Sequence, residues 1–145
     1  MSQIQSADYI SQMTEQDKII FLQFLVMLAK IDNHFDEVEK EFITATADNL
    51  HISSDKLGAI LQTDSADEVI HQASLITNRF VALNIIKEAC FLANSDDDLS
   101  AEEVTFIGRF GEAMGVEPQT VEAISQWVID YLIWQEQGKI IFEQN

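Results

Sequence analysis

The sequence is poor in the residues that end or bend regular structure. Its 145 residues include one proline and five glycines. Folds built from many short strands need turn residues at frequent intervals, so this scarcity argues against an all-β protein. No segment alternates apolar and polar residues with a period of two, so no sheet is predicted. Helices joined by few, short connections are favoured instead.

Cysteine and long apolar runs are also scarce. Cys90 is the only cysteine, which excludes an intramolecular disulfide and indicates a reducing environment. The densest apolar run, residues 19–29, is about half as long as the roughly 20 residues that a membrane-spanning helix needs. Residues 1–8 lack the basic and apolar regions of a signal peptide. We therefore expect a cytoplasmic protein without direct membrane insertion.

Positive charge is the third scarcity. Eight lysines and arginines stand against 25 aspartates and glutamates, which gives a formal net charge of −17. Such a surface repels phosphate backbones and anionic lipid headgroups, so nucleic-acid binding and electrostatic docking on a bilayer are disfavoured. Metal cations or a basic protein partner are favoured. Hydrophobic residues make up 47% of the chain, enough for a folded core rather than a disordered acidic tail.

One pattern occurs twice, 64 residues apart. Residues 28–43 read LAKIDNHFDEVEKEFI, and residues 92–107 read LANSDDDLSAEEVTFI. Six positions are identical in the two copies: Leu28 and Leu92, Ala29 and Ala93, Asp32 and Asp96, Glu39 and Glu103, Phe42 and Phe106, and Ile43 and Ile107. Any two helical hairpins share apolar positions, but the paired acidic residues indicate an internal two-fold repeat.

Capping residues and apolar periodicity predict a bundle of about seven or eight helices. The expected helices cover residues 14–30, 36–50, 53–61, 65–76, 79–94, 100–115 and 118–136. Three of them begin with a capping-box pattern: Asp36 with Glu39, Ser65 with Glu68, and Ser100 with Glu103. They should form a single compact all-α domain over residues 1–145, with repeat halves at about 14–62 and 78–136. Gly138 should end the last helix and leave residues 137–145 as a tail.

Acidic side chains gather in the turn between the two helices of each repeat. The candidate metal ligands are Asp32, Asp36 and Glu39 in the first turn and Asp96, Asp97, Asp98 and Glu103 in the second. Calcium and magnesium prefer such oxygen ligands, and adjacent carboxylates repel one another without a cation between them. We predict that the turns bind a divalent cation, calcium or magnesium. The alternative is that these residues only cap helices, since acidic side chains stabilise a helix N terminus without a metal.

The spacing excludes an EF-hand. With Glu103 at the twelfth loop position, Leu92 falls where a carboxylate is obligatory and Asp97 falls where glycine is expected. The first repeat fails in the same way, with Leu28 at the first position. His34 lies in the first turn, but a solvated loop histidine is a simpler interpretation than a nitrogen ligand.

Both repeat cores, residues 21–52 and 85–116, follow one order of residues. An apolar helix ends in Leu-Ala, and then come Asp, a turn, an apolar residue, a cap, Glu and a Phe-Ile pair. This order resembles the TerB family of tellurite-resistance proteins. The matching acidic positions are Asp32, Glu39, Asp96 and Glu103. The family usually has glycine after the aspartate, where this chain has Asn33 and Asp97, residues that also tolerate a left-handed turn.

The resemblance implies an all-helical, internally duplicated fold. It also implies a role in resistance to tellurite and other stresses, in membrane-linked assemblies, with metal sensing through the acidic residues. Related domains occur fused to other modules, so the resemblance bears more directly on fold than on role.

Aromatic residues form a stripe in the last predicted helix, at Trp127, Tyr131 and Trp134. Core packing is the simpler interpretation, and a partner or dimer surface is the alternative. Residues 139–142, which are apolar after Lys139, are a candidate docking peptide if they do not fold back onto the bundle.

Three functional hypotheses follow. The first is a cytoplasmic TerB-like stress-response protein that binds divalent cations and joins a membrane-associated complex through a protein partner. The second is a metal-independent module that recruits a basic or membrane-associated partner, and the third is a DNA mimic. A homodimer is compatible with all three. No phosphate loop, nucleophile motif or acid–base constellation occurs, so neither enzyme activity nor an organic cofactor is predicted. Cys90 lies in an apolar run and should be a buried thiol, poorly suited to tellurite reduction.

Overall fold

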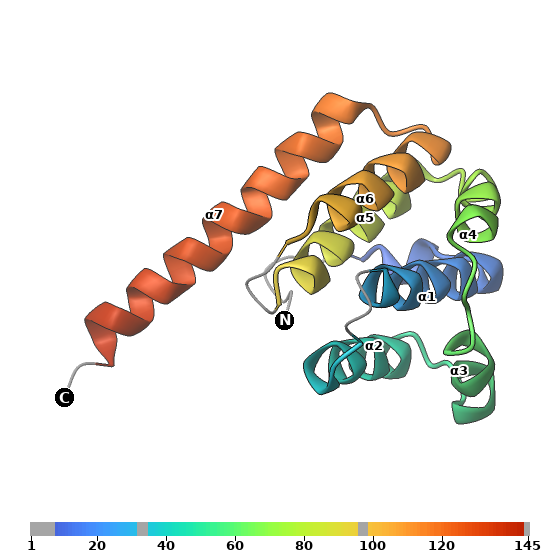
Figure 1. The fold of residues 1–145 in the computed structure, drawn as a ribbon, viewed down its shortest axis with the longest axis horizontal. Coiled ribbons are helices and arrows are strands. Elements are labelled where there is room, and N and C mark those ends of the chain that lie inside the picture. Colours follow the sequence, from blue (N-terminus) through green and yellow to red (C-terminus); the bar gives the residue numbers. More distant parts are fainter. Residues whose placement is uncertain (1–7, 32–34, 96–98, 144–145) are drawn as a thin grey trace.

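The computed structural model describes residues 8–31, 35–95 and 99–143, and this part of the chain is all-helical, as predicted (Figure 1). A short 3-10 helix, Ile10–Gln12, precedes seven α-helices. The α-helices are α1 (Glu15–Lys30), α2 (Glu37–Asn49), α3 (Ser54–Ile60), α4 (Ala66–Ala73), α5 (Arg79–Ala93), α6 (Ala101–Ala113) and α7 (Pro118–Phe142). None of these helices in the described part is long and apolar enough to cross a membrane.

Polar caps fix the N termini of the helices close to where the sequence predicts them. Before α1, the Thr14 side chain accepts a hydrogen bond from the Asp17 amide (2.9 Å), and Asp17 accepts one in return from the Thr14 amide (3.0 Å). Similar reciprocal capping boxes open α2 and α6. Each box satisfies two backbone N–H groups that the helix itself leaves without partners.

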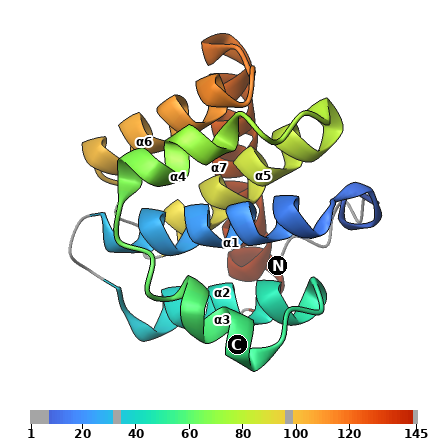
Figure 2. The same ribbon diagram turned by 90° about the vertical axis from the view of Figure 1, so that its right-hand side faces the viewer.

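Helices α1 and α5 form the centre of the molecule. Figure 2 shows α1 running through the middle, with α4, α5 and α6 on one side and α2 and α3 on the other. Twelve of the fifteen residues of α5 are buried, so its neighbours cover it on nearly every side. Phe24 of α1 stacks on Phe110 of α6, with ring centroids 3.7 Å apart and ring planes 3° apart. This apolar core holds the ends of both helical hairpins in place.

Local geometry recurs at positions 64 residues apart. His51 follows α2 with a φ of 58°, and Gly115 follows α6 with a φ of 85°. The next residue in each copy donates its amide to the carbonyl five residues back: Ile52 to Ala47 (3.0 Å) and Val116 to Gly111 (2.8 Å). Both helices therefore end in the same kind of left-handed C-terminal cap. This agreement is limited to the two C-terminal caps, and the internal two-fold repeat stays a prediction.

Helix α7 is longer than predicted. It continues through Gly138 to Phe142, so the prediction that Gly138 ends the helix was wrong, and residues 137–142 are helical rather than a tail. The physical reason is that one interior glycine costs a helix only about 1 kcal/mol relative to alanine. In Figure 1 the C-terminal half of α7 projects past the ends of α5 and α6.

The two tryptophans of the aromatic stripe on α7 lie outside the core, contrary to the simpler interpretation, whereas Tyr131 packs against it. Trp127 is 47% exposed and Trp134 is 69% exposed, whereas Val128 is the single buried residue of α7. Tyr131 is half-buried and meets the Phe91 ring edge-on, with centroids 5.8 Å apart. The stripe lies beside the face through which α7 packs on the bundle. The sequence did not predict this, because apolar periodicity identifies a stripe on a helix but not the neighbour that covers it.

Candidate metal sites at the acidic turns

Two glutamates lie in the helices that follow the acidic turns. Glu39 lies in the first turn of α2 and Glu103 in the first turn of α6. Their side chains are almost fully buried, at 1% and 2% exposure. The cap residues before them, Asp36 and Ser100, are closer to solvent.

The capping boxes hold these glutamates in one orientation. The Asp36 amide donates to Glu39 Oε1 (3.3 Å), and the Ser100 amide donates to Glu103 Oε1 (2.9 Å). In return, the Glu39 amide donates to Asp36 Oδ1 (2.9 Å), and the Glu103 amide donates to Ser100 Oγ (3.1 Å). Both carboxylates are thereby fixed directly beside the acidic turns, and burial of a glutamate is uncommon without compensating partners.

The rest of the predicted ligand set lies outside the described residues. This applies to Asp32, Asp96, Asp97 and Asp98, and also to His34. Within residues 8–31, 35–95 and 99–143, no three His, Cys, Asp or Glu side chains gather closely enough to hold a metal ion. Asp36, Glu39 and Glu103 therefore do not make a site by themselves, and any site must draw on the turn aspartates.

The residue that precedes the first turn lies close to the residues that follow the second turn. Ile31, at the end of α1, lines the same shallow groove as Ala101 and Glu102 at the start of α6. This groove has a volume of about 330 Å³ and also includes Thr105 and Arg109. The residues that lead into the first turn thus lie close to the residues that follow the second.

A lysine distinguishes the first turn from the second. Lys30 Nζ donates to the carbonyls of Leu61 (2.7 Å) and Thr63 (2.9 Å) and lies 5.9 Å from the centre of the Phe35 ring. Its equivalent in the second repeat is Asn94, whose side chain donates to the Cys90 carbonyl (2.8 Å). A fixed positive charge therefore lies beside the first turn, where it would oppose cation binding.

A buried polar cluster on α5 was not anticipated from the sequence. Lys87 Nζ lies 3.4 Å from Glu88 Oε2 and 5.2 Å from the centre of the Tyr9 ring. Burial lowers the pKa of Lys87, whereas burial and the nearby Glu88 carboxylate raise the pKa of Tyr9. The signal in the sequence is a charged pair inside residues 81–93, a run in which Asn84 is the one other polar residue. The cluster ties the N-terminal segment to the central helix.

Two grooves flank α7. One has a volume of about 390 Å³ and is bounded by Leu83, Asn84 and Lys87 of α5 and by Thr120, Ala123, Ile124 and Trp127 of α7. The other, of about 420 Å³, lies where α5, α6 and the start of α7 meet, and Cys90 contributes to its wall. Cys90 is 3% exposed, which confirms the prediction of a buried thiol, and burial raises its pKa to about 12.

Comparisons with known proteins give no match: no family model, curated protein or solved structure is similar to this chain. The resemblance to the TerB family therefore rests on the residue order in the two repeat cores.

Proposed function

We propose that this chain is a TerB-like stress-response protein that binds a divalent cation, calcium or magnesium, at its acidic turns. The observation that carries the proposal is the pair of buried, oriented glutamates, Glu39 and Glu103, at equivalent positions beside the two turns. A role in tellurite resistance, in the cytoplasm and within a membrane-associated complex, accompanies this proposal through the family resemblance.

The second turn is the stronger candidate for the cation. It carries three consecutive aspartates, residues 96–98, and Asn94 takes the place of the lysine that lies beside the first turn. Three adjacent carboxylates raise the local negative potential, and a divalent ion would relieve their repulsion. In this proposal Asp96 and Glu103 are ligands, with Asp97 or Asp98 assisting. Asp32, Asp36 and Glu39 form the weaker site.

Thermal unfolding of the chelator-treated protein tests the proposal. Calcium and magnesium are added at constant ionic strength, because any salt stabilises a chain at −17 through screening. A cation at about 100 times its dissociation constant stabilises the fold by about 2.7 kcal/mol, which shifts the midpoint visibly. We expect a saturable shift that Asp96→Asn abolishes and Asp32→Asn reduces only slightly.

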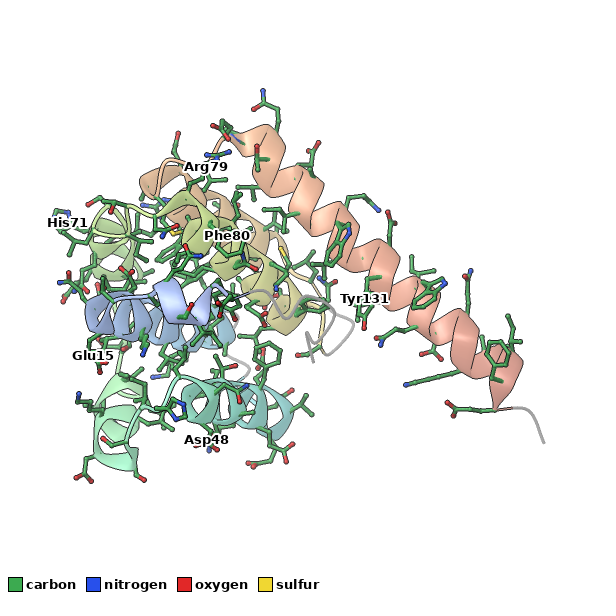
Figure 3. All side chains as sticks on the ribbon, turned by 180° about the vertical axis from the view of Figure 1, so that it is seen from behind. Glu15, Asp48, His71, Arg79, Phe80 and Tyr131 are labelled. Carbon is green, nitrogen blue, oxygen red and sulfur yellow. The ribbon has the colours of Figure 1, made fainter. Side chains whose placement is uncertain are left out.

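Asp48→Asn is the matched control for the loss of one negative charge. Asp48 is exposed near the end of α2, away from the N-terminal end of that helix, where the first turn lies (Figure 3). This variant should keep the full cation response. If Asp96→Asn also keeps it, or if no ion shifts the midpoint beyond the ionic-strength control, the turns act only as helix caps.

The exposed apolar surface of α7 favours a second candidate function, a metal-independent interaction module. Trp134, Ile140, Ile141 and Phe142 are 58–84% exposed. Apolar patches of this kind on a soluble domain commonly mark interaction sites. A partner that binds equally well to the chelator-treated protein and to Asp96→Asn would support this function over cation sensing.

A further inference from the structure

One face of α7, beside the face that packs on the bundle, carries a heptad pattern along most of the helix. Apolar or small residues follow one another at alternating intervals of three and four residues: Ile124, Trp127, Tyr131, Trp134, Gly138 and Ile141. This is the a/d spacing that lets two helices pack along a continuous seam. In heptad letters, Ile124, Tyr131 and Gly138 are a positions, and Trp127, Trp134 and Ile141 are d positions. We call these six residues the α7 seam.

The α7 seam is accessible in the folded chain. Trp127, Trp134 and Ile141 are 47%, 69% and 58% exposed, and Ile124 and Tyr131 are half-buried. The aromatic rings form a ladder along it, with Tyr131 lying 6.1 Å from Trp127 and 6.4 Å from Trp134 between ring centroids. Figure 3 places Tyr131 midway along the helix, at the point where α7 leaves the bundle. The chain therefore presents its three d-position residues to solvent, whereas Ile124 and Tyr131 at a positions are half-buried because they also pack against the core.

The charges of α7 are arranged to leave the seam neutral. Two of its three acidic residues, Glu122 and Glu136, occupy f positions, on the side of the helix away from the seam. The positions that flank the C-terminal half of the seam are Asp130, Gln135, Gln137 and Phe142, and one of these four is charged. A basic partner helix would be matched by acidic flanks. Neutral flanks instead match a second neutral seam, even though the whole chain carries −17.

Gly138 provides an independent observation. A Cβ atom built on Gly138 meets nothing within 4 Å, and its φ is not positive, so nothing within the folded chain requires glycine there. A glycine inside a helix nevertheless weakens it. Glycine at an a position does allow a large side chain from a facing helix to approach the backbone closely.

We propose that α7 pairs antiparallel with α7 of a second copy of this chain through the α7 seam. In an antiparallel pair each a position faces a d position of the other helix. One register satisfies all three layers: Gly138 faces Trp127, Tyr131 faces Trp134, and Ile124 faces Ile141, and each contact occurs twice around a two-fold axis. The smallest seam residue thus receives a tryptophan. Asp130 falls near Gln137 of the other helix, so like charges do not meet.

The groove between α5 and α7 extends the same surface. It is mostly apolar and lies alongside the first half of the seam, where it is bounded by Leu83 of α5 and by Ala123, Ile124 and Trp127 of α7. In the antiparallel register the projecting end of the second helix, with Ile141 and Phe142, reaches this groove. Each bundle thereby covers the end of α7 that the other leaves exposed, which closes the assembly at two copies.

Sedimentation and light scattering of the chelator-treated chain over a wide concentration range test the proposal. We expect twice the monomer mass of 16.4 kDa, independent of metal. Trp134→Glu should weaken the dimer by more than about tenfold, since it places a charge at the centre of the seam. Ile133→Glu is the matched control. It adds the same charge at a neighbouring residue that is 51% exposed but lies off the seam, so the dimer should persist.

Two further variants test the register. Gly138→Leu should weaken the dimer by more than about tenfold without lowering helical content, because the added side chain has open space in the single chain but meets the facing tryptophan in the pair. Under oxidation, an equal mixture of Ile124→Cys and Ile141→Cys should form a disulfide-linked dimer. Neither variant should do so alone, since each residue lies on the order of 25 Å along the helix from its own copy in the pair.

Several outcomes would overturn the proposal. They are a monomeric mass at every concentration, a dimer that Ile133→Glu dissociates and Trp134→Glu does not, and a cross-link in either cysteine variant alone, which would indicate a parallel pair. Binding of the monomer to anionic vesicles in place of self-association would assign the seam to a membrane. Because these measurements are made without metal, their failure would leave the cation proposal untouched.

Discussion

The single thiol shows how burial decides the chemistry of a residue. Cys90 lies in the wall of the groove beside α7, and burial raises its pKa to about 12, although a hydrogen bond with Ser125 acts in the opposite direction. At pH 8 its thiolate fraction is then about a thousand times below that of an exposed cysteine. We expect a chromogenic aromatic disulfide to react with Cys90 slowly in the native protein and at once in urea. Rapid reaction of the native protein would mean that the groove opens readily.

The sequence indicated which side chains cap helices, but it missed which side chains are buried and which are exposed, in each case for the same reason. It identified Glu39 and Glu103 through their capping pattern, but their burial depends on how neighbouring helices pack, which no local pattern encodes. The Lys87–Glu88 pair was missed because a charged pair in a helix is normally a solvated feature. Trp127 was assigned to the core because a stripe of aromatics normally faces one. In each case the missing information was which second helix lies alongside.

Two glycines of α6 show how an element constrains its neighbours. A Cβ on Gly111 would lie 2.9 Å from Val121 Cγ2 of α7 and 3.4 Å from Ile86 Cδ1 of α5, whereas a Cβ on Gly108 meets nothing within 4 Å. Gly108→Ala should stabilise the fold by up to about 1 kcal/mol through helix propensity alone. Gly111→Ala makes the same gain but overpacks the three-helix junction, so we expect a net loss of about 1 kcal/mol. Urea unfolding of the two variants measures both effects, and a stabilised Gly111→Ala would mean that α7 shifts easily.

The helix boundaries were the most predictable feature of the fold, because the capping residues that set them are local in the sequence. The N-terminal caps at Thr14, Asp36 and Ser100 lie where the sequence indicated. The end of α7 was the exception. A single glycine weakens a helix without stopping it, and Gly138 does not adopt the positive φ that would end the helix in a left-handed cap. The continued helix completes the last heptad of the α7 seam, so this error also concealed the surface on which the dimer proposal rests.

Over the whole molecule, few ion pairs compensate the excess of negative charge. Three of the ion pairs in the described part of the chain are exposed: Lys56 with Glu15 (3.2 Å), Arg79 with Glu117 (2.7 Å) and Arg109 with Asp67 (3.4 Å). Such pairs contribute little to stability, because water and salt screen them. They join distant elements but cannot balance 25 acidic residues against eight basic ones. The apolar core therefore holds the fold together against a general repulsion.

This balance predicts how the fold responds to salt. Raising the ionic strength from about 0.01 M to 0.15 M shortens the screening length from about 30 Å to about 8 Å, which weakens repulsion across the whole molecule. The same change weakens the exposed ion pairs, but these are short-range and few, so the midpoint of thermal unfolding should rise. Sodium chloride and choline chloride should act alike, because screening depends on ionic strength and not on the cation. A rise with sodium alone would point to a specific monovalent site, and a falling midpoint would mean that the ion pairs outweigh the repulsion. The shift with divalent ions at constant ionic strength must therefore be measured above this baseline, and the part of it that Asp96→Asn removes is the part that the cation proposal predicts.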